Sequence, residues 1–282
     1  MMSWQAVVEK VTVFFMNEGD KDFYNLILRG IILSAIFVFA SSFIRNIPTY
    51  GKLAAKDQKV PLLMSITIGH NLSWFLMESP SFFIGFILYF FFGPTSIIYN
   101  PPNFILMMMF LLHYANRSFI YPWTSKASKP WPLVLTFCAA LFTSINGYIQ
   151  ARYHGFYASA YPLEWLYDPR FIMGSLIFLW GFWANRLCDR ILSQLRSPSD
   201  PPGTYKIPQG FMFQYISSAN YFCEIVEWIG FAIASWSLAG TAFALFTFCN
   251  TAPRAYHAHQ FYLAKFKDQY PKNRKALIPF LW

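Results

Sequence analysis

Long apolar stretches alternate with short polar segments along the whole chain. Segments rich in proline and glycine, such as GPTSIIYNPP and SPSDPPGTYKIPQG, separate these stretches and are typical of loops. A bilayer-spanning helix needs about 20 apolar residues. Stretches of that length lie near residues 24–45, 60–92, 103–123, 133–152, 170–192, 212–236 and 239–266. The pattern predicts about seven transmembrane helices, although Pro80 also allows the second stretch to be a span followed by a separate short helix.

The composition is that of a membrane protein. Of the 282 residues, 56% are hydrophobic and only 12% are charged, whereas about a quarter of the residues of a soluble domain are charged. The chain contains no internal repeat. We therefore predict an all-α fold, an integral membrane helical bundle, in which residues 1–282 form a single domain and residues 1–23 precede the first span.

The basic residues predict the orientation, because cytoplasmic loops of membrane proteins are enriched in lysine and arginine. Of the 22 lysines and arginines, 15 fall on one side of the seven-span arrangement and four on the other, and three lie inside spans. This split places the N-terminus outside and the C-terminus in the cytoplasm. It also explains the net charge of +9 without nucleic acid as a partner. The larger group comprises Arg45, Lys52, Lys56, Lys59, Lys126, Lys129, Arg186, Arg190, Arg196, Lys206, Lys265, Lys267, Lys272, Arg274 and Lys275.

Polar side chains inside spans cost free energy and usually mark function, and a first group of them lies in the second span. Asn71, Trp74 and Glu78 follow the spacing i, i+3, i+7, which places them on one face of a helix. A carboxyl group in such a place can hold or donate a proton, because desolvation favours its protonated form. The alternative is a solvated helix cap, since Glu78 stands close to Pro80.

The run LLHYANRSFIYPW carries a second group, His113, Tyr114, Arg117 and Tyr121. Tyr114, Arg117 and Tyr121 again share the spacing i, i+3, i+7. The phenol of Tyr114 is suited to donate a hydrogen bond to a substrate carbonyl. The alternatives are a tyrosine at the membrane interface and an arginine that snorkels to the surface.

A third group, Asn220, Glu224, Glu227 and Trp228, forms a polar stripe in the sixth span. Its two acids have no cation nearby in the sequence. Because an ionised and unpaired buried acid is too costly, they need partners from another helix. The stripe is therefore part of a binding site or, alternatively, a polar clamp between helices.

The fourth group lies near the predicted cytoplasmic ends of the later helices. Carboxylates and amides beside several cations suit ribose hydroxyls and phosphate oxygens, and the alternative for the cations is anchoring at the membrane surface. We expect no metal, because two of the histidines point in nearly opposite directions on a helix and no third ligand is suitably spaced. The group consists of Arg254, His257, His259, Tyr262, Asn185, Asp189, Arg196, Tyr205 and Lys206.

Several familiar signatures are missing from the chain. It has no G-x-G-x-x-G after a strand, no G-x-x-x-x-G-K-[ST], no G-x-S-x-G and no H-E-x-x-H. If a dinucleotide binds here, transmembrane helices rather than a Rossmann fold must hold it.

Several runs of residues resemble the steroid 5α-reductase family (3-oxo-5α-steroid 4-dehydrogenases). The strongest are YKIPQGFMFQYISSANYFCEIVEWIGFAIASWSL and RAYHAHQFYLAKFKDQYPKNRKALIPFLW. The runs WFLMESPSF, LLHYANRSFIY, NGYIQ, DPRF and ANRLCDRILSQLR extend the likeness upstream, so that it covers most of residues 65–282.

The resemblance implies an NADPH-dependent oxidoreductase that acts on CH–CH groups. It would reduce the 4,5 double bond of 3-oxo-4-ene steroids, with hydride transfer to C5. Glu78 and Tyr114 would be catalytic and would hold the 3-oxo group, with Trp74 beside them in the substrate site. Residues 170–282 would form most of the cofactor site. The residues expected to bind NADPH are Lys129, Asn185, Asp189, Arg196, Tyr205, Lys206, Asn220, Glu224, Trp228, Arg254, His257 and Tyr262.

Other functions stay open at this level. They are a related membrane enoyl or polyprenol reductase, a membrane S-adenosylmethionine-dependent methyltransferase, and a transporter or sterol-binding scaffold. For the favoured function we expect a monomer, surrounded by membrane lipid, whose lipophilic enone substrate enters from the bilayer. A bacterial inner membrane is favoured over the endoplasmic reticulum because the chain carries no retention signal, and the cofactor site should face the cytoplasm.

Overall fold

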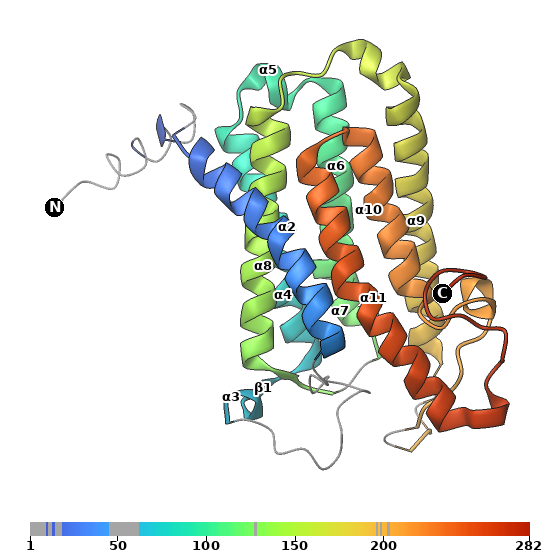
Figure 1. Ribbon diagram of the computed structural model, residues 1–282. Coiled ribbons are helices and arrows are strands. Elements are labelled where there is room, and N and C mark those ends of the chain that lie inside the picture. The colour runs from blue at the N-terminus through green and yellow to red at the C-terminus, as the bar shows by residue number, and fades with distance from the viewer. Residues whose placement is uncertain are drawn as a thin grey trace.

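The chain folds into a bundle of long helices (Figure 1). The computed structural model describes residues 10, 13–14, 19–44, 62–126, 129–195, 197, 199–201 and 204–282. The predicted all-α class is confirmed. The long helices are α2 (Lys21–Ile44), α4 (His70–Phe92), α6 (Pro101–Ala115), α8 (Leu133–Arg152), α9 (Pro169–Gln194), α10 (Ala219–Ser235) and α11 (Leu238–Phe266).

Short elements connect the long helices. Two strands of two residues each pair antiparallel, with Thr67 opposite Pro132. We call the end of the bundle that carries α3 and β1 in Figure 1 the lower end, and the end that carries α5 the upper end. The short elements are α3 (Leu62–Ser65), β1 (Thr67–Ile68), α5 (Thr95–Ile98), the π-helix η2 (Asn116–Ile120), α7 (Tyr121–Thr124), β2 (Trp131–Pro132), the π-helix η3 (Tyr153–Tyr157), and the 3₁₀ turns η4 (Leu163–Tyr167), η5 (Phe211–Gln214) and η6 (Lys267–Gln269).

Five helical segments are long and apolar enough to cross a membrane. They are Lys21–Ser42, His70–Phe92, Pro101–Thr124, Leu133–Tyr157 and Pro169–Gln194. Helices α10 and α11 pack on each other and on these segments, α10 on α9 and α11 on α2. The total of seven spans, the orientation of the termini and the single-domain organisation stay predictions. Five of the basic residues used for the orientation, Arg45, Lys52, Lys56, Lys59 and Arg196, lie outside the described residues.

Two helices begin later than the apolar pattern predicted. The second span does not start at residue 60, because α3 and β1 occupy this segment and α4 starts only at His70. Helix α4 then continues through Pro80 to Phe92, so the alternative of a separate short helix after Pro80 is wrong. The sixth span starts at Ala219 rather than at residue 212, after the turn η5. Apolar turns next to a span have the same hydropathy as the span, so their sequence does not mark the boundary.

Helix α8 supports α4 at the point where Pro80 interrupts the backbone hydrogen bonds. The hydroxyl of Thr143 donates 2.5 Å to the carbonyl of Met77, and the hydroxyl of Ser81 donates 2.7 Å to the carbonyl of Thr143. Gly147 permits this approach, because a Cβ atom at its position would lie 2.9 Å from the carbonyl oxygen of Ser81. These hydrogen bonds and the close approach at Gly147 hold α4 and α8 together beside Glu78.

Helices α9 and α10 lie side by side (Figure 1) with their backbones in direct contact. A Cβ atom at Gly181 would stand 2.5 Å from the backbone nitrogen of Glu227, and one at Gly230 would stand 2.3 Å from that of Phe178. Glycines let transmembrane helices approach this closely. The contact aligns the polar residues of α9 with the acids of α10.

The C-terminal segment braces the start of α10. A parallel bridge joins Ile216 and Lys275. The buried guanidinium of Arg274 donates 3.0 Å to the carbonyl of Pro208 and 3.3 Å to the side chain of Gln209. Two motifs that are far apart in the sequence, IPQG and YPKNRKALIPF, thus form one structural unit below α10.

Candidate active site

Tyr114 lies in the interior of the bundle, on α6, and its hydroxyl group contacts α8. The side-chain amide of Asn146 donates 3.0 Å to this hydroxyl oxygen, and both residues are buried. Gln150 in turn donates 3.4 Å to Oδ1 of Asn146. Ser81 is a further polar neighbour of the phenol. Because Asn146 occupies an acceptor site of the hydroxyl oxygen, the phenolic proton can be donated to Ser81 or to a ligand.

Glu78 lies on α4 in the same electrostatic environment as Tyr114. Its half-buried carboxyl group interacts with Arg117, Glu224 and Tyr114. Among the contacts of the described residues there is no direct hydrogen bond between Glu78 and Tyr114. Glu78 and Tyr114 thus interact electrostatically rather than through a hydrogen bond. Their assigned role in holding a carbonyl group stays a prediction.

Arg117 stands between two aromatic rings at the π-helix η2. Its guanidinium carbon lies 4.6 Å from the ring centre of Trp74 and 4.4 Å from that of Tyr121, while Nη1 lies 3.4 Å from Oδ2 of Asp189. The alternative of a snorkelling arginine is wrong, because Arg117 is only 8% exposed. π-Helical turns are frequent at functional sites, and the spacing of Tyr114, Arg117 and Tyr121 could not reveal this one.

His113 and Glu227 connect α6 to α10. Nδ1 of His113 and Oε1 of Glu227 are 2.7 Å apart, and both side chains are buried. The expectation that the acids of α10 need partners from another helix is confirmed for Glu227. The second carboxylate oxygen, Oε2, has no hydrogen-bond partner within the part of the chain that the structure describes.

Trp228 lies in the aromatic core rather than on the surface of a cleft. The indole is fully buried, and its ring centre is 4.5 Å from that of His113 and 4.4 Å from that of Phe243. Tyr114 packs into the same core, 6.2 Å from Trp228 between ring centres. The core therefore holds Tyr114 rigidly against the α10 side of the site.

Asn185 joins α9 to α10 above the lower end. Its buried amide nitrogen donates 2.9 Å to the backbone carbonyl of Asn220. Its Oδ1 atom is buried without a hydrogen-bond partner among the described residues. The structure thus brings together Asn185 and Asn220, which the sequence pattern had placed in two separate groups, and leaves one acceptor available.

Arg186 corrects the sequence analysis. The count of basic residues places it in a cytoplasmic loop, but it lies inside α9. Its guanidinium carbon is 3.5 Å from the ring centre of Phe182, one turn earlier. Its three side-chain nitrogens are buried and have no hydrogen-bond partner in the described ranges. Hydropathy cannot show this, because an arginine near a helix end looks the same whether it turns outward or inward.

Six of these side chains interact electrostatically inside the bundle. We call this set the charged cluster. It combines residues of α4, η2, α9 and α10 that lie far apart in the sequence. The charged cluster consists of Glu78, Arg117, Arg186, Asp189, Glu224 and Glu227.

The other predicted cofactor residues lie nearer the lower end. Nζ of Lys206 pairs with Asp200 at 2.6 Å. The ring of Tyr205 packs on Phe261, with 5.0 Å between ring centres. Lys129 is exposed. Arg196 lies outside the described residues.

Helix α11 directs its polar side chains to different neighbours. Arg254 donates 3.1 Å to Oδ1 of Asn250 on the preceding turn. His257 lies 3.3 Å from the carbonyl of Ser42 on α2, whereas His259 lies 2.6 Å from the hydroxyl of Ser217. Tyr262 stacks on Tyr270 with 5.6 Å between ring centres. The two histidines thus face different elements, as the sequence predicted.

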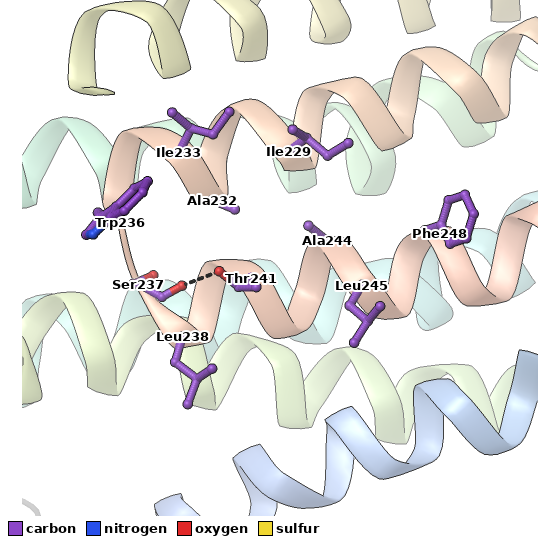
Figure 2. Close-up of a pocket in the computed structure, with 10 residues that line it drawn as sticks. All are labelled: Ile229, Ala232, Ile233, Trp236, Ser237, Leu238, Thr241, Ala244, Leu245 and Phe248. Carbon is purple, nitrogen blue, oxygen red and sulfur yellow. Dashed lines mark hydrogen bonds between the residues drawn. The ribbon is translucent and has the colours of Figure 1, made fainter. Parts of the chain in front are cut away.

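A groove of about 560 Å³ lies between α10 and α11, apart from the charged cluster (Figure 2). Apolar side chains such as Ile229, Leu245 and Phe248 form most of it, and Trp236 and Ser237 close one end. None of its lining residues is a predicted site residue. Because Ile229 and Leu245 are exposed, we assign this groove to the lipid-facing surface.

Curated proteins similar to this chain are named as steroid-reducing enzymes. A 3-oxo-5-alpha-steroid 4-dehydrogenase 1 from Bos taurus is 49% identical over 189 residues, which cover 67% of this chain and 72% of that protein. Steroid 5-alpha-reductase DET2 from Gossypium hirsutum is 43% identical over 220 residues, covering 77% and 83%. The 3-oxo-5-alpha-steroid 4-dehydrogenase 1 of Homo sapiens is 44% identical over 211 residues, covering 74% and 79%.

The organisms of these relatives bear on the membrane in which the chain resides. They are mammals and a plant. The predicted bacterial inner membrane therefore receives no support, whereas the multi-pass membrane character agrees with the five apolar helices.

The sequence profile of the 3-oxo-5-alpha-steroid 4-dehydrogenase family matches residues 129–282. This region contains α8 to α11, the glycine contact of α9 with α10, and the C-terminal brace. Together with the identities above, the match shows that the chain belongs to the 3-oxo-5-alpha-steroid 4-dehydrogenase family and is an oxidoreductase that acts on CH–CH groups.

Proposed function

We propose that the protein reduces the 4,5 double bond of 3-oxo-4-ene steroids to 5α-3-oxo steroids with NADPH. The observation that carries the proposal is the hydroxyl group of Tyr114. It is buried, it accepts a hydrogen bond from Asn146, and it keeps a proton to donate. A related enoyl or polyprenol reductase would need the same group, so the substrate class rests on the family and on the experiment below.

Tyr114 would act where charge develops in the reaction. NADPH supplies a hydride to C5 when it is bound, and negative charge then grows on the 3-oxo oxygen. A phenolic hydrogen bond to this oxygen becomes stronger as the charge grows, which lowers the barrier. Glu78, within electrostatic range of Tyr114, would help to orient the phenol and the carbonyl group, with Trp74 near them. Protonation at C4 completes the reduction.

The residues between α9 and α10 are chemically suited to a dinucleotide. Buried groups without hydrogen-bond partners among the described residues include Oδ1 of Asn185, the guanidinium of Arg186, Oε2 of Glu227 and the indole nitrogen of Trp228. Such groups are costly unless a polar ligand pairs with them. We propose that Asn185, Asp189, Asn220 and Glu224 bind the cofactor together with the lower-end residues Lys129, Arg196, Tyr205, Lys206, Arg254, His257 and Tyr262.

We further propose the membrane arrangement that this chemistry needs. With α10 and α11 added to the five apolar segments, the chain crosses the membrane seven times, and its lower end faces the cytoplasm, where NADPH is supplied. The steroid enters from the bilayer into a monomeric protein, because its apolar skeleton dissolves in the hydrocarbon core.

The proposal is tested with purified protein, NADPH and testosterone or progesterone. We expect NADPH oxidation together with a 5α-reduced product, detected by chromatography and mass spectrometry. Glu78→Gln should lower turnover by more than about tenfold without changing the thermal unfolding temperature. A polyprenoid enone reduced in place of the steroids, or S-adenosylmethionine retained in place of NADPH, would overturn the proposal.

A further inference from the structure

Arg186 and Glu227 are two ionic groups with buried polar atoms that interact electrostatically without a hydrogen bond between them. Among charged groups, Glu227 acts most strongly on Arg186, and Arg186 acts most strongly on Glu227. All three nitrogens of Arg186 and the Oε2 atom of Glu227 nevertheless stay without hydrogen-bond partners among the described residues. A structural ion pair would join these atoms directly.

The neighbours of both side chains hold them in place. The guanidinium of Arg186 rests on the ring of Phe182 at 3.5 Å. The other oxygen of Glu227 is bound to His113 at 2.7 Å. Gly181 brings the backbone of α9 against the backbone of Glu227, where a Cβ atom would approach to 2.5 Å. The free atoms of the pair are therefore presented by a rigid contact between two helices.

The two free groups have opposite hydrogen-bonding character. A guanidinium only donates hydrogen bonds, and an ionised carboxylate only accepts them. A ligand group that satisfies both must carry an acceptor and a donor on adjacent atoms. A primary carboxamide has this arrangement, since its C=O accepts and its NH₂ donates. A phosphate satisfies Arg186 but is repelled by Glu227.

The location of the pair agrees with such a ligand group. His113, the partner of Glu227, neighbours Tyr114, with 5.1 Å between ring centres. Arg117 and Asp189 also interact electrostatically with Arg186. A nicotinamide that transfers hydride to a substrate held by Tyr114 must lie close to Tyr114, and its carboxamide must then find partners in the same region.

We propose that Arg186 and Glu227 bind the carboxamide of the nicotinamide ring, with Arg186 donating to its oxygen and Oε2 of Glu227 accepting from its nitrogen. This inference rests on the proposed function, because it presumes that NADPH is the cofactor. The pair would recognise the redox end of the dinucleotide and would set the rotation of the ring relative to the steroid.

Equilibrium binding without steroid tests the inference. The affinity of purified protein is measured through the fluorescence of tryptophan and of the reduced nicotinamide. The ligands are NADPH, its 3-acetylpyridine analogue, which keeps the C=O but lacks the NH₂, and 2′-phospho-ADP-ribose, which lacks the nicotinamide. The proteins are the wild type, Arg186→Met, Arg186→Lys, Glu227→Gln and the control Arg190→Met, which changes an exposed arginine one turn further along α9.

We expect Arg186→Met to weaken NADPH binding by about tenfold or more, the usual cost of a lost hydrogen bond to a charged group. The affinity for 2′-phospho-ADP-ribose should not change, and Arg186→Lys should restore part of the NADPH affinity. The wild type should prefer NADPH over the acetylpyridine analogue, and Glu227→Gln should reduce this preference several-fold. Arg190→Met should bind all three ligands like the wild type.

Three results would overturn the inference while leaving the proposed function intact. They are unchanged NADPH affinity in Arg186→Met, an equal loss for 2′-phospho-ADP-ribose, which would assign Arg186 to a phosphate, and a wild type that does not distinguish the carboxamide from the acetyl group. The last comparison needs no variant, so it holds even if a substitution prevents folding. A wild type that neither binds NADPH nor reduces steroid would instead remove the proposed function itself.

Discussion

Two arginines of the bundle, Arg152 and Arg186, interact with carboxylates in surroundings that differ sharply. At the upper end, Arg152 donates 2.7 Å to Oδ1 and 3.0 Å to Oδ2 of Asp20. The hydroxyls of Tyr148 and Tyr157 also donate to this carboxylate. In the charged cluster, by contrast, Arg186 stands next to Glu227 without a hydrogen bond. Both arginines lie in helices of the bundle, Arg152 in α8 and Arg186 in α9, but they differ in the hydrogen bonds that their neighbours provide.

The comparison separates structural charge from charge kept for a ligand. A buried ion pair survives where hydrogen bonds fill its remaining lone pairs and protons, and the Asp20–Arg152 pair meets this condition. Burial raises the pKa of Asp20, but the hydrogen bonds from Arg152, Tyr148 and Tyr157 outweigh it and hold that pKa below its ordinary value. The upper pair thus fastens α2 to α8, whereas the Arg186–Glu227 pair leaves its hydrogen-bonding capacity for another molecule.

Breaking the upper pair should have the largest effect. Arg152→Met leaves the buried carboxylate of Asp20 without its cation, although the hydroxyls of Tyr148 and Tyr157 still donate to it. We expect the substitution to lower the free energy of unfolding by about 3–5 kcal/mol. Thermal unfolding in detergent measures this change. NADPH affinity of the protein that remains folded should stay near the wild-type value, because the pair lies at the end of the bundle opposite the predicted cofactor site.

Two further variants check this reading. Arg29→Met, at an exposed position of α2, should leave the unfolding temperature unchanged. The double variant Asp20→Leu/Arg152→Met should recover part of the loss, since neither charge is then left alone. A single variant as stable as the wild type would contradict the assignment of a structural pair.

Removing the hydroxyl group of Tyr114 should have the next largest effect, which we expect on kcat rather than on stability. Tyr114→Phe takes away the donor to the developing enolate, so we expect kcat to fall by about tenfold to a thousandfold. Steady-state kinetics with a 3-oxo-4-ene steroid measure the change. Tyr99→Phe, at an exposed position, is the matched control. Near-normal turnover in Tyr114→Phe would show that another group polarises the carbonyl.

A methyl group at Gly181 tests whether the close contact between the backbones of α9 and α10 positions Arg186 relative to Glu227. Gly181→Ala would place a Cβ atom 2.5 Å from the backbone nitrogen of Glu227, which should cost about 1–3 kcal/mol of stability. It should also weaken NADPH binding, because α9 and α10 must separate and the distance from Arg186 to Glu227 changes. Gly30→Ala, whose Cβ atom would meet nothing within 4 Å, should be neutral or stabilising. Equal stability and equal NADPH affinity of Gly181→Ala and Gly30→Ala would refute the close approach of α9 and α10 at Gly181.

An exposed ion pair at the start of α9 should show the smallest effect. Hydrogen bonds from the side chain and the backbone of Arg170 lower the pKa of Asp168 from 3.8 to about 2. A depressed pKa in the folded state stabilises the protein above about pH 4. This contribution disappears as the pH falls through about 2.

Asp168→Asn should therefore lower the unfolding temperature slightly at pH 7, with the difference vanishing near pH 2. The effect is small because water screens exposed pairs. Thermal unfolding of both proteins between pH 7 and pH 2 measures it. A difference that persists at the lowest pH would show that Asp168 acts through its shape as a helix cap rather than through its charge.

Much of the fold and part of the candidate site could be predicted from the sequence. The apolar pattern located the seven long helices of the part of the chain that the structure describes, because burial in lipid requires a continuous run of apolar residues. The expectation that the buried acids of α10 need partners from another helix was correct for Glu227, which contacts His113 of α6. The boundaries near residues 60 and 212 were wrong, because apolar turns share the hydropathy of the helices that they precede.

The sequence by itself determined several of the polar residues that enter the bundle, among them Glu78, Tyr114 and Glu227, and, through motifs such as IPQG and YPKNRKALIPF, the family of the chain. Only the tertiary structure decided which of those residues meet. Glu227 contacts His113 and interacts electrostatically with Arg186, and Asp20 pairs with Arg152. The physical reason is that periodicity fixes neighbours along one helix, whereas contacts between helices depend on packing, here on the glycines that bring α9 against α10. The same packing turns Arg186 inward and leaves it unpaired among the described residues.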